Sequence, residues 1–266
     1  MEGKKSMKTV NSLLSLLLLS ISNSAFTTTP ISICTDNNFW YPFTFVKGNT
    51  VTGLHIDIIR KALQNLGYQP VFKPMPWQEC LSEAKEGKVD GVATASYKDE
   101  RAAYFNYPVG AASDKKSPFR VSQIEYRVIT SALDKEGKPS TYVFNGDIKE
   151  LPQPVRGNMS YSLIADLKKE GISVVEEKHA PTNFKKLIKE HTGSIVDLNE
   201  VAQYYNLQPE FTGKIKVQPH PLISKSYYLV FSKRGTISLE QAQKIWDEIA
   251  KVREEPSIMT EFLKKY

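Results

Sequence analysis

The sequence contains few of the residues that build metal centres and nucleophilic centres. Its 266 residues include two cysteines and four histidines, and these six show none of the spacings that metal ligands use. It has no Gly-rich phosphate-binding loop and no Gly-x-Ser-x-Gly nucleophile elbow. Residues 82–85 match the Ser-x-x-Lys pattern of penicillin-binding enzymes, but the Ser-Asp-Asn and Lys-Thr-Gly partners are missing, so we interpret the match as chance. We therefore expect no metal ion and no cofactor.

A strong excess of one charge is also missing. The formal net charge is +6, and it falls to +4 if residues 1–25 are removed, because that segment carries three lysines and one glutamate. Along the rest of the chain, lysines are interleaved with acidic residues, as on a solvated surface. This pattern gives no reason to expect nucleic acid as a partner, and we expect the protein to be a monomer.

The first residues of the chain have the pattern of an export signal. Three lysines within the first eight residues precede an apolar and serine run at 13–21, and small residues follow up to Ala25. A basic segment, a short apolar segment and a small-residue exit are typical of a secretory signal peptide. The apolar run is too short to span a bilayer comfortably. We predict a cleaved signal peptide over residues 1–25 and export to the periplasm.

The two cysteines, Cys34 and Cys80, lie beyond this predicted signal peptide. In an exported protein they could form a disulfide. Both lie in segments that we expect to be packed, where a buried free thiol is also common. The sequence leaves both alternatives open.

The first half of the mature chain alternates strand and helix patterns. Short apolar, β-branched stretches predict strands, and apolar residues at helical spacing followed by glycine predict helices. In order along the chain, we predict a strand at 31–34, a hairpin at 46–53, a helix at 56–66, a strand at 70–72, a helix at 78–86 and a strand at 89–95. This alternation is typical of a parallel α/β unit.

Three loops of this unit should lie together. Ligands of parallel α/β sheets bind beyond the carboxyl ends of the strands. Those ends are followed here by residues 36–41, 75–77 and 94–101. We therefore expect one rim that carries aromatic side chains, hydroxyl groups and the guanidinium of Arg101.

The second half of the chain repeats the pattern. We predict strands at 154–156, 172–175 and 194–198, helices at 160–169 and around 184–188, a helix at 200–205 capped by Asn199, and a helix at 239–252 with a short helix after Pro256. Two α/β lobes with facing rims imply a ligand cleft between them. We expect lobe 1 to comprise residues 31–112 plus 226–266 and lobe 2 residues 113–225, with a crossing inside 111–138.

The residues of the first half resemble a known family. The segment TDNNFWYPF at 35–43, the Gly-x-x-Asp pattern at 87–90, and the hydroxyl, Glu-Arg and aromatic-Pro pattern at 94–108 are similar to the family 3 extracellular solute-binding proteins. These are the periplasmic receptors of polar amino-acid ABC transporters. The resemblance implies a two-lobed periplasmic-binding-protein-like fold of type II, which captures an amino acid or small carboxylate and delivers it to a permease in the inner membrane.

The resemblance also implies roles for residues of the first lobe. Arg101 would clamp the ligand carboxylate, with Ser96 and Thr94 as hydroxyl partners. A planar guanidinium suits a carboxylate better than an ammonium would. An aromatic residue, Trp40 or Tyr41, would stack on the ligand, and Trp77 would line the same pocket.

Further candidates come from both lobes. Asp36 follows the first strand and could meet a ligand amino group, while Ser160 and Tyr161 open a helix of the second lobe. Ser160 could instead be a helix N-cap. The resemblance implies that a carboxylate of the second lobe meets the ligand ammonium. By its position in the strand, this residue is Asp197; by its position at the helix cap, it is Asn199, which would leave the ammonium without a counter-charge. Both assignments stay open.

Two other functions fit the same fold. A dehydratase-like enzyme would need a general acid in the cleft, and Glu176 or Glu177 could serve. A periplasmic sensor input domain would bind the same kind of ligand but act on a receptor. The resemblance favours a binding protein over an enzyme.

Overall fold

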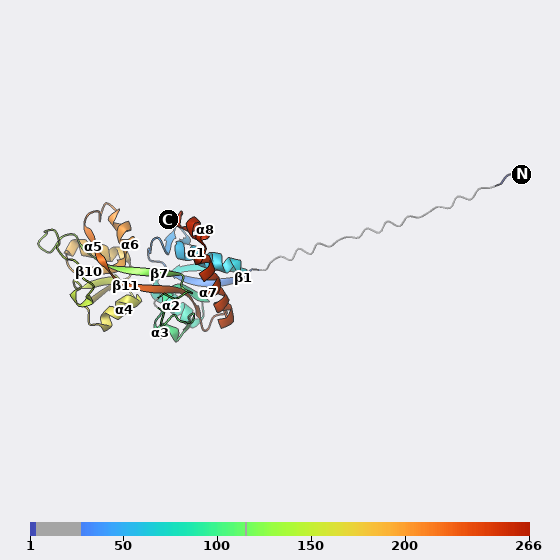
Figure 1. Ribbon diagram of the computed structural model, residues 1–266, viewed down its shortest axis with the longest axis horizontal. Coiled ribbons are helices and arrows are strands. Elements are labelled where there is room, and N and C mark those ends of the chain that lie inside the picture. Colours follow the sequence, from blue (N-terminus) through green and yellow to red (C-terminus); the bar gives the residue numbers. More distant parts are fainter. Residues whose placement is uncertain (4–27, 115) are drawn as a thin grey trace.

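The computed structural model describes residues 1–3, 28–114 and 116–266. From residue 4 onward, the predicted signal peptide lies outside the described residues. The helices and strands form two lobes, joined by the long strands β7 (Ser122–Ser131) and β11 (Ile215–Ser232) (Figure 1). No helix within the described ranges is long and apolar enough to cross a membrane.

The first lobe is built on a parallel sheet in the order β4-β1-β5, with the end of β11 antiparallel to β5. The predicted strands and helices of this part are confirmed, within a few residues. They are β1 (Thr29–Asp36), β2 (Phe45–Lys47), β3 (Thr50–Thr52), α1 (Leu54–Asn65), β4 (Tyr68–Met75), α2 (Trp77–Glu86) and β5 (Gly91–Ser96). Two short elements that were not predicted follow, α3 (Asp99–Ala102) and β6 (Phe105–Asn106).

The C-terminal helices α7 (Leu239–Glu254) and α8 (Pro256–Leu263) also belong to this lobe. A capping box starts α7, because Ser238 accepts from the Gln241 amide while the Gln241 side chain accepts from Ser238. The helix buries Trp246 against the sheet, and its indole N–H donates to the Leu229 carbonyl at 2.7 Å. The end of the chain is therefore part of the first lobe's core.

The second lobe contains the sheet order β7-β10-β8-β9, in which β10, β8 and β9 are parallel. Apart from a short 3-10 helix at 148–150, which was not predicted, its elements match the predicted alternation. They are η1 (Ile148–Glu150), β8 (Val155–Asn158), α4 (Ser162–Lys169), β9 (Val174–Glu177), α5 (Ala180–Glu190), β10 (Ser194–Leu198) and α6 (Asn199–Asn206).

The two sheets are continuous through β7 and β11, which pair antiparallel with each other and run between the lobes (Figure 1). The predicted crossing within 111–138 contains β7. The second crossing strand was not predicted. Pro219 and Pro221 interrupt its pattern, and the register shifts on both sides of Pro221 because proline cannot donate to the ladder.

Two predicted caps are wrong. The N-cap of α6 is Leu198, and Asn199 is already the first helical residue, so its side chain makes no cap hydrogen bond. The N-cap of α4 is Tyr161, whereas Ser160 lies one residue earlier with a positive φ of 63°. Relative to the predicted cap residues, α6 therefore starts one residue earlier and α4 one residue later.

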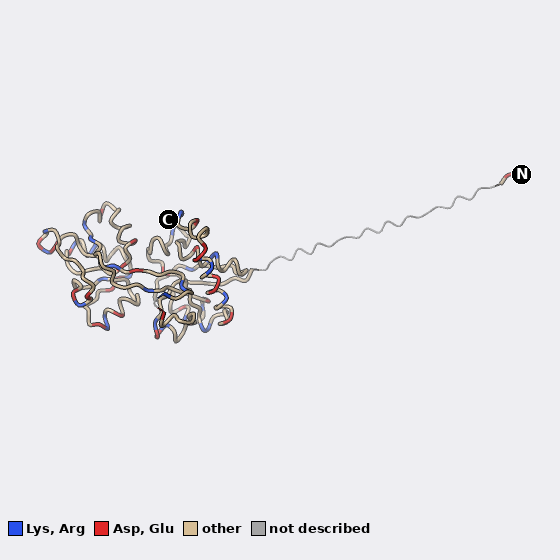
Figure 2. The backbone as a smooth tube through the Cα atoms, in the orientation of Figure 1, with Lys and Arg blue, Asp and Glu red and all other residues tan. Residues whose placement is uncertain are grey.

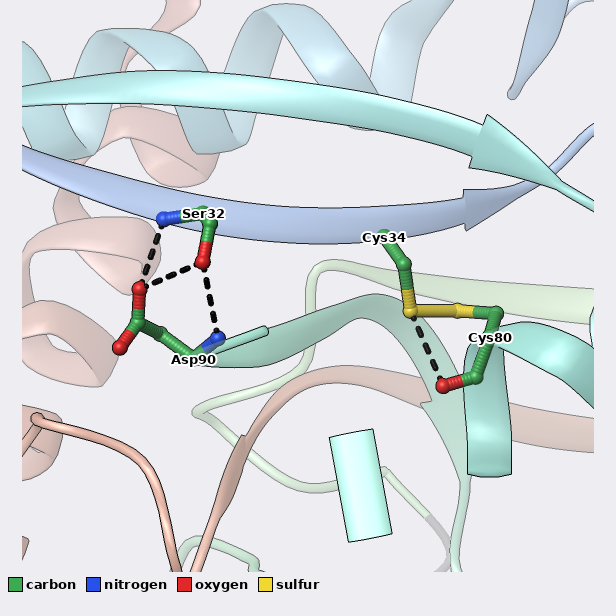
Figure 3. The surroundings of a disulfide bond; sticks show 4 residues. All are labelled: Ser32, Cys34, Cys80 and Asp90. Carbon is green, nitrogen blue, oxygen red and sulfur yellow. Dashed lines mark hydrogen bonds between the residues drawn. A yellow bond between two sulfur atoms is a disulfide. The ribbon is translucent and has the colours of Figure 1, made fainter. Parts of the chain in front are cut away.

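Cys34 and Cys80 form a disulfide with Cα atoms 5.5 Å apart, which decides the alternative that the sequence left open (Figure 3). It joins β1 to α2. In the same view, Asp90 accepts from the amide and hydroxyl of Ser32 at 2.8 and 2.7 Å. Its other oxygen accepts from the Thr236 hydroxyl at 2.6 Å. The aspartate of the Gly-x-x-Asp pattern therefore links β1 to the loop between β11 and α7, and it does not line the cavity described below.

Candidate functional site

A cavity lies between the lobes, at the carboxyl ends of the first-lobe strands. Side chains from both lobes and from both crossing strands form its wall: Asp36, Trp40, Thr44, Trp77, Thr94, Ser96, Arg101, Tyr126, Tyr161, Ser162 and Tyr227. Its free volume is about 30 Å³, enough for about two water molecules at roughly 10–15 Å³ each. A larger molecule can enter only if the lobes separate or the wall rearranges.

Arg101 lies on α3, directly after the end of β5. Its guanidinium donates to the carbonyl and hydroxyl of Ser96 at 3.2 and 3.4 Å and to the Ser160 carbonyl at 3.4 Å. It also lies over the Trp77 indole, 5.3 Å from the ring centre. Within the described residues, no carboxylate forms an ion pair with Arg101. These contacts are long for hydrogen bonds, so a closer anionic acceptor would be preferred.

Asp36 supplies the opposite charge to the same cavity. One carboxylate oxygen accepts from the Tyr161 hydroxyl at 2.7 Å, and the other accepts from the Asn38 amide at 3.0 Å. Burial raises the pKa of this carboxyl, although the hydrogen bonds from Asn38 and Tyr161 oppose the shift. As far as the structure describes the chain, no lysine or arginine pairs with Asp36. The cavity therefore has one unpaired cation and one unpaired carboxyl group.

Hydroxyl and N–H groups complete the wall. The hydroxyls of Tyr126 and Tyr227 share a hydrogen bond of 2.5 Å. Burial raises the pKa of Tyr227 to about 12 and that of Tyr126 well above its ordinary value, so both stay protonated. The Trp77 indole N–H is buried and has no acceptor among the described residues. An unpaired buried donor on a cavity wall is available to a bound molecule.

Hydrogen bonds across the cleft show that the lobes are closed. Besides the bond between Asp36 and Tyr161, the hydroxyls of Ser96 and Ser162 lie 2.8 Å apart. The Gln78 amide donates to the Ser160 hydroxyl at 2.7 Å. Each of these bonds joins the first lobe to α4 or to the residues directly before it.

The structure brings most of the predicted site residues together. Asp36, Trp40, Trp77, Thr94, Ser96, Arg101 and Tyr161 line the cavity. Ser160 lies at its edge, where its carbonyl and hydroxyl accept from Arg101 and Gln78.

Tyr41 is not on the cavity wall. Its neighbour Trp40 pairs with Thr44 in a β-bridge and points inward, and Tyr41 therefore points to the opposite side. There its ring stacks on Phe39, and its hydroxyl donates to the Tyr266 carbonyl. Of the two aromatic candidates, only Trp40 reaches the cavity.

Neither second-lobe candidate for an ammonium partner lines the cavity. Asp197 is buried behind the wall and accepts from the Leu198 amide at 2.8 Å. Burial raises the pKa of Asp197 to about 7, and the Leu198 amide and the nearby Trp40 indole oppose this shift. The indole N–H of Trp40 is close to Asp197 but makes no hydrogen bond within the described residues. Asn199 is partly exposed at the start of α6. Asp36 is therefore the carboxylate that the cavity wall contains.

Four wall residues were missed from the sequence: Thr44, Tyr126, Ser162 and Tyr227. Ser162 follows Ser160 and Tyr161 and could have been included with them. Tyr126 lies on β7, inside the predicted crossing, but its orientation toward the cavity was not predicted. Tyr227 lies on β11, the crossing strand that was not predicted.

Residues 31–117 match the family Bacterial extracellular solute-binding proteins, family 3. No match was found among the curated proteins. Solved structures with a similar fold include the GluR0 ligand-binding core from Nostoc punctiforme in complex with L-glutamate, with 19% identity, a TM-score of 0.66 and coverage of 89% of this chain and 99% of that chain. Another is the arginine-, lysine-, histidine-binding protein ArtJ from Geobacillus stearothermophilus, with 16% identity, a TM-score of 0.67 and coverage of 90% and 95%.

A histidine kinase sensor domain with similarity to periplasmic binding proteins is also similar, with 14% identity, a TM-score of 0.71 and coverage of 89% and 95%. At these identities, the likeness shows the fold alone. It confirms the predicted α/β fold of two lobes, of the type II periplasmic-binding-protein class.

Proposed function

We propose that this chain captures an amino acid or similar small carboxylate in the periplasm. The match of residues 31–117 to the family 3 extracellular solute-binding proteins supports this proposal. The lobes close over the molecule, and the closed protein delivers it to an ABC transporter permease in the inner membrane. The observation that supports this most strongly is the unpaired Arg101 guanidinium in a cavity closed by both lobes.

The charges of the wall favour a ligand with both an acid and an amino group. A ligand carboxylate would take the Arg101 donors, with Thr94 and Ser96 as hydroxyl partners. An amino group would pair with Asp36 on the same lobe. Each charge-assisted hydrogen bond contributes about 1.5–3 kcal/mol, whereas micromolar binding needs about 8 kcal/mol. Burial against the Trp40 and Trp77 rings would supply the rest.

Closure couples this recognition to the second lobe. Tyr161 and Ser162 reach Asp36 and Ser96 only when α4 lies against the first lobe. A ligand that touches both lobes therefore binds the closed form better and shifts the population toward it. In this mechanism the first lobe selects the ligand, and the second lobe retains it.

The test is a thermal-shift screen of amino acids and small carboxylates on the purified mature protein, because a ligand stabilises the form that it binds. Titration calorimetry with the best hit then compares wild type with Arg101→Met and Arg101→Lys. We expect Arg101→Met to weaken binding by about 10- to 100-fold, from the loss of roughly 1.5–3 kcal/mol. Arg101→Lys should restore only part of this loss.

Arg60→Met is the matched control, because Arg60 pairs with Asp57 on α1 and does not line the cavity. It should bind like wild type. Equal affinity in Arg101→Met and wild type would remove Arg101 from the site.

A sensor input domain is the second candidate, and the similar fold of a histidine kinase sensor domain favours it. Deleting the gene separates the two roles: a transport receptor is needed for uptake of the labelled ligand, whereas a sensor is needed only for the transcriptional response. The enzymatic alternative has less support. Glu176 and Glu177 pair with Lys168 and Lys186, and neither lines the cavity.

A further inference from the structure

Beside the cavity, one carboxylate lies between two lysines from different parts of the fold. Asp166, on α4 of the second lobe, pairs with Lys98, which follows β5 in the first lobe. Its other oxygen lies 2.8 Å from the ammonium of Lys225, on the crossing strand β11. Asp166 thus joins the first lobe, the second lobe and the crossing strand.

This cluster is more enclosed than an ordinary surface ion pair. The side chains of Lys98 and Lys225 are 17% and 14% exposed, and that of Asp166 is 37% exposed. Burial lowers the pKa of Lys225, and the charges of Lys98 and Arg101 add to the shift, while Asp166 opposes it. Removing the carboxylate would therefore leave Lys98 and Lys225 without their acidic partner, close to a third cation, Arg101.

The cluster is connected to the ligand cavity. The Lys225 ammonium donates to the Ser162 hydroxyl at 3.4 Å, which in turn lies 2.8 Å from the Ser96 hydroxyl. Ser96 accepts from Arg101. A row of polar contacts therefore leads from Asp166 to the guanidinium that we assign to the ligand carboxylate.

We infer that Asp166 is a positioning residue that holds the lobes closed and sets how long a captured molecule stays bound. The inference rests on the proposed function, in which closure retains the ligand. When the lobes separate, Asp166 loses Lys98, and the ion pair between the two lobes is broken. The closed form is stabilised by the ion pairs in addition to the contacts made by the ligand.

The structure offers a matched control at the same boundary. Lys169, also on α4, pairs with Glu100 of the first lobe at 3.2 Å, but both side chains are about two-thirds exposed, at 66% and 65%. Exposed ion pairs contribute little to stability, whereas removing one partner of an enclosed pair leaves an uncompensated charge. The two sites therefore differ mainly in burial.

The experiment measures ligand association and dissociation rates by stopped-flow tryptophan fluorescence, with L-glutamate and L-arginine as the first probes. We expect Asp166→Asn to raise the dissociation rate of the ligand by about 10-fold, because the ion pairs of Asp166 are enclosed but still partly screened by solvent. The association rate should stay within about threefold of wild type. Lys169→Gln should match wild type. An unchanged dissociation rate in Asp166→Asn, or an equal increase in Lys169→Gln, would overturn the inference.

Lys98→Gln breaks the same bridge from the other lobe and serves if Asp166→Asn fails to fold. A double-mutant cycle of Lys98→Gln with Asp166→Asn isolates the coupling between the two side chains. We expect the double variant to dissociate no faster than the faster single variant. Fully additive effects would mean that the two residues act separately and would contradict the bridge.

Small-angle scattering of the ligand-free proteins separates this inference from the proposed function. We expect Asp166→Asn to have a larger radius of gyration than wild type and Lys169→Gln to be unchanged. If no compound of the thermal-shift screen binds but Asp166→Asn still opens, the bridge stands and the proposed function fails. If the probes bind and neither the rates nor the radius change, the bridge fails and the proposed function stands.

Discussion

The substitution Asp197→Asn should change how the stability of this protein depends on pH. Asp197 is buried behind the cavity, and its pKa is raised to about 7 from 3.8, chiefly by burial. A carboxyl with a raised pKa binds its proton more tightly in the folded state than in the unfolded state. Its contribution to stability is fully present below pH 3.8 and is lost as the pH rises through 7.

The magnitude follows from the shift. Each pKa unit corresponds to about 1.36 kcal/mol, so a rise from 3.8 to about 7 lowers the free energy of unfolding by on the order of 4 kcal/mol across this range. Asparagine keeps the shape of the neutral acid but has no proton to lose. The variant should therefore gain stability relative to wild type as the pH rises from about 4 to 8.

His55 acts in the opposite direction and hides this effect in wild type. It is fully buried between Thr44 and Ser122, and burial lowers its pKa from 6.5 to about 3. Its contribution is present above pH 6.5 and is lost as the pH falls toward 3. Between about pH 4 and 6.5, the contributions of Asp197 and His55 to the free energy of unfolding change with pH in opposite directions and by similar amounts. Together they should therefore leave the stability of wild type nearly independent of pH in this range.

Urea unfolding of wild type and Asp197→Asn, at pH values from about 4 to 8, tests this reasoning. We expect the variant's free energy of unfolding to rise with pH up to about 6.5, as His55 alone dictates, while that of wild type changes much less. His55→Gln should show the opposite slope. A difference between Asp197→Asn and wild type that stays constant with pH would refute the raised pKa of Asp197.

Three further predictions concern stability and closure. Replacing Cys34 and Cys80 by serine opens a loop with a sequence separation of 46, which should cost about 4 kcal/mol by chain entropy; an unchanged melting temperature would contradict it. Gly193→Ala should cost about 1–3 kcal/mol in denaturant unfolding, because Gly193 has φ +75° and a Cβ there would overlap the Pro154 carbonyl. Tyr161→Phe removes the interlobe hydrogen bond to the first lobe's cavity carboxylate and should weaken ligand binding by about 10-fold in calorimetry; wild-type affinity would show that this bond does not support closure.

The distribution of charge bears on the same mechanism. Lysines, arginines and acidic residues are interleaved over both lobes, without a one-signed face in the view shown (Figure 2). The unpaired charged groups of the cavity are therefore local features and do not belong to a larger region of one charge on the protein. Recognition of a small ligand should depend on Arg101 and Asp36 more than on the net charge.

The strand and helix periodicities in the sequence predicted most elements of the two α/β lobes, because apolar spacing shows which face of a segment is buried. They also placed Arg101 and Trp77 near each other, since the carboxyl ends of parallel strands share one edge. Which of two adjacent aromatic residues points into the cavity was decided by the β-bridge at Trp40, which no local pattern shows.

The tertiary structure also decided which residues of the crossing strands and the second lobe line the cavity. Prolines conceal the strand pattern of β11, so Tyr227 could not be assigned to the wall. Asp197 lies on a strand and Asn199 starts a helix, yet neither lines the cavity. Local sequence specifies how a segment folds, but the faces that meet across a cleft depend on how the two lobes pack, which involves residues far apart in the chain.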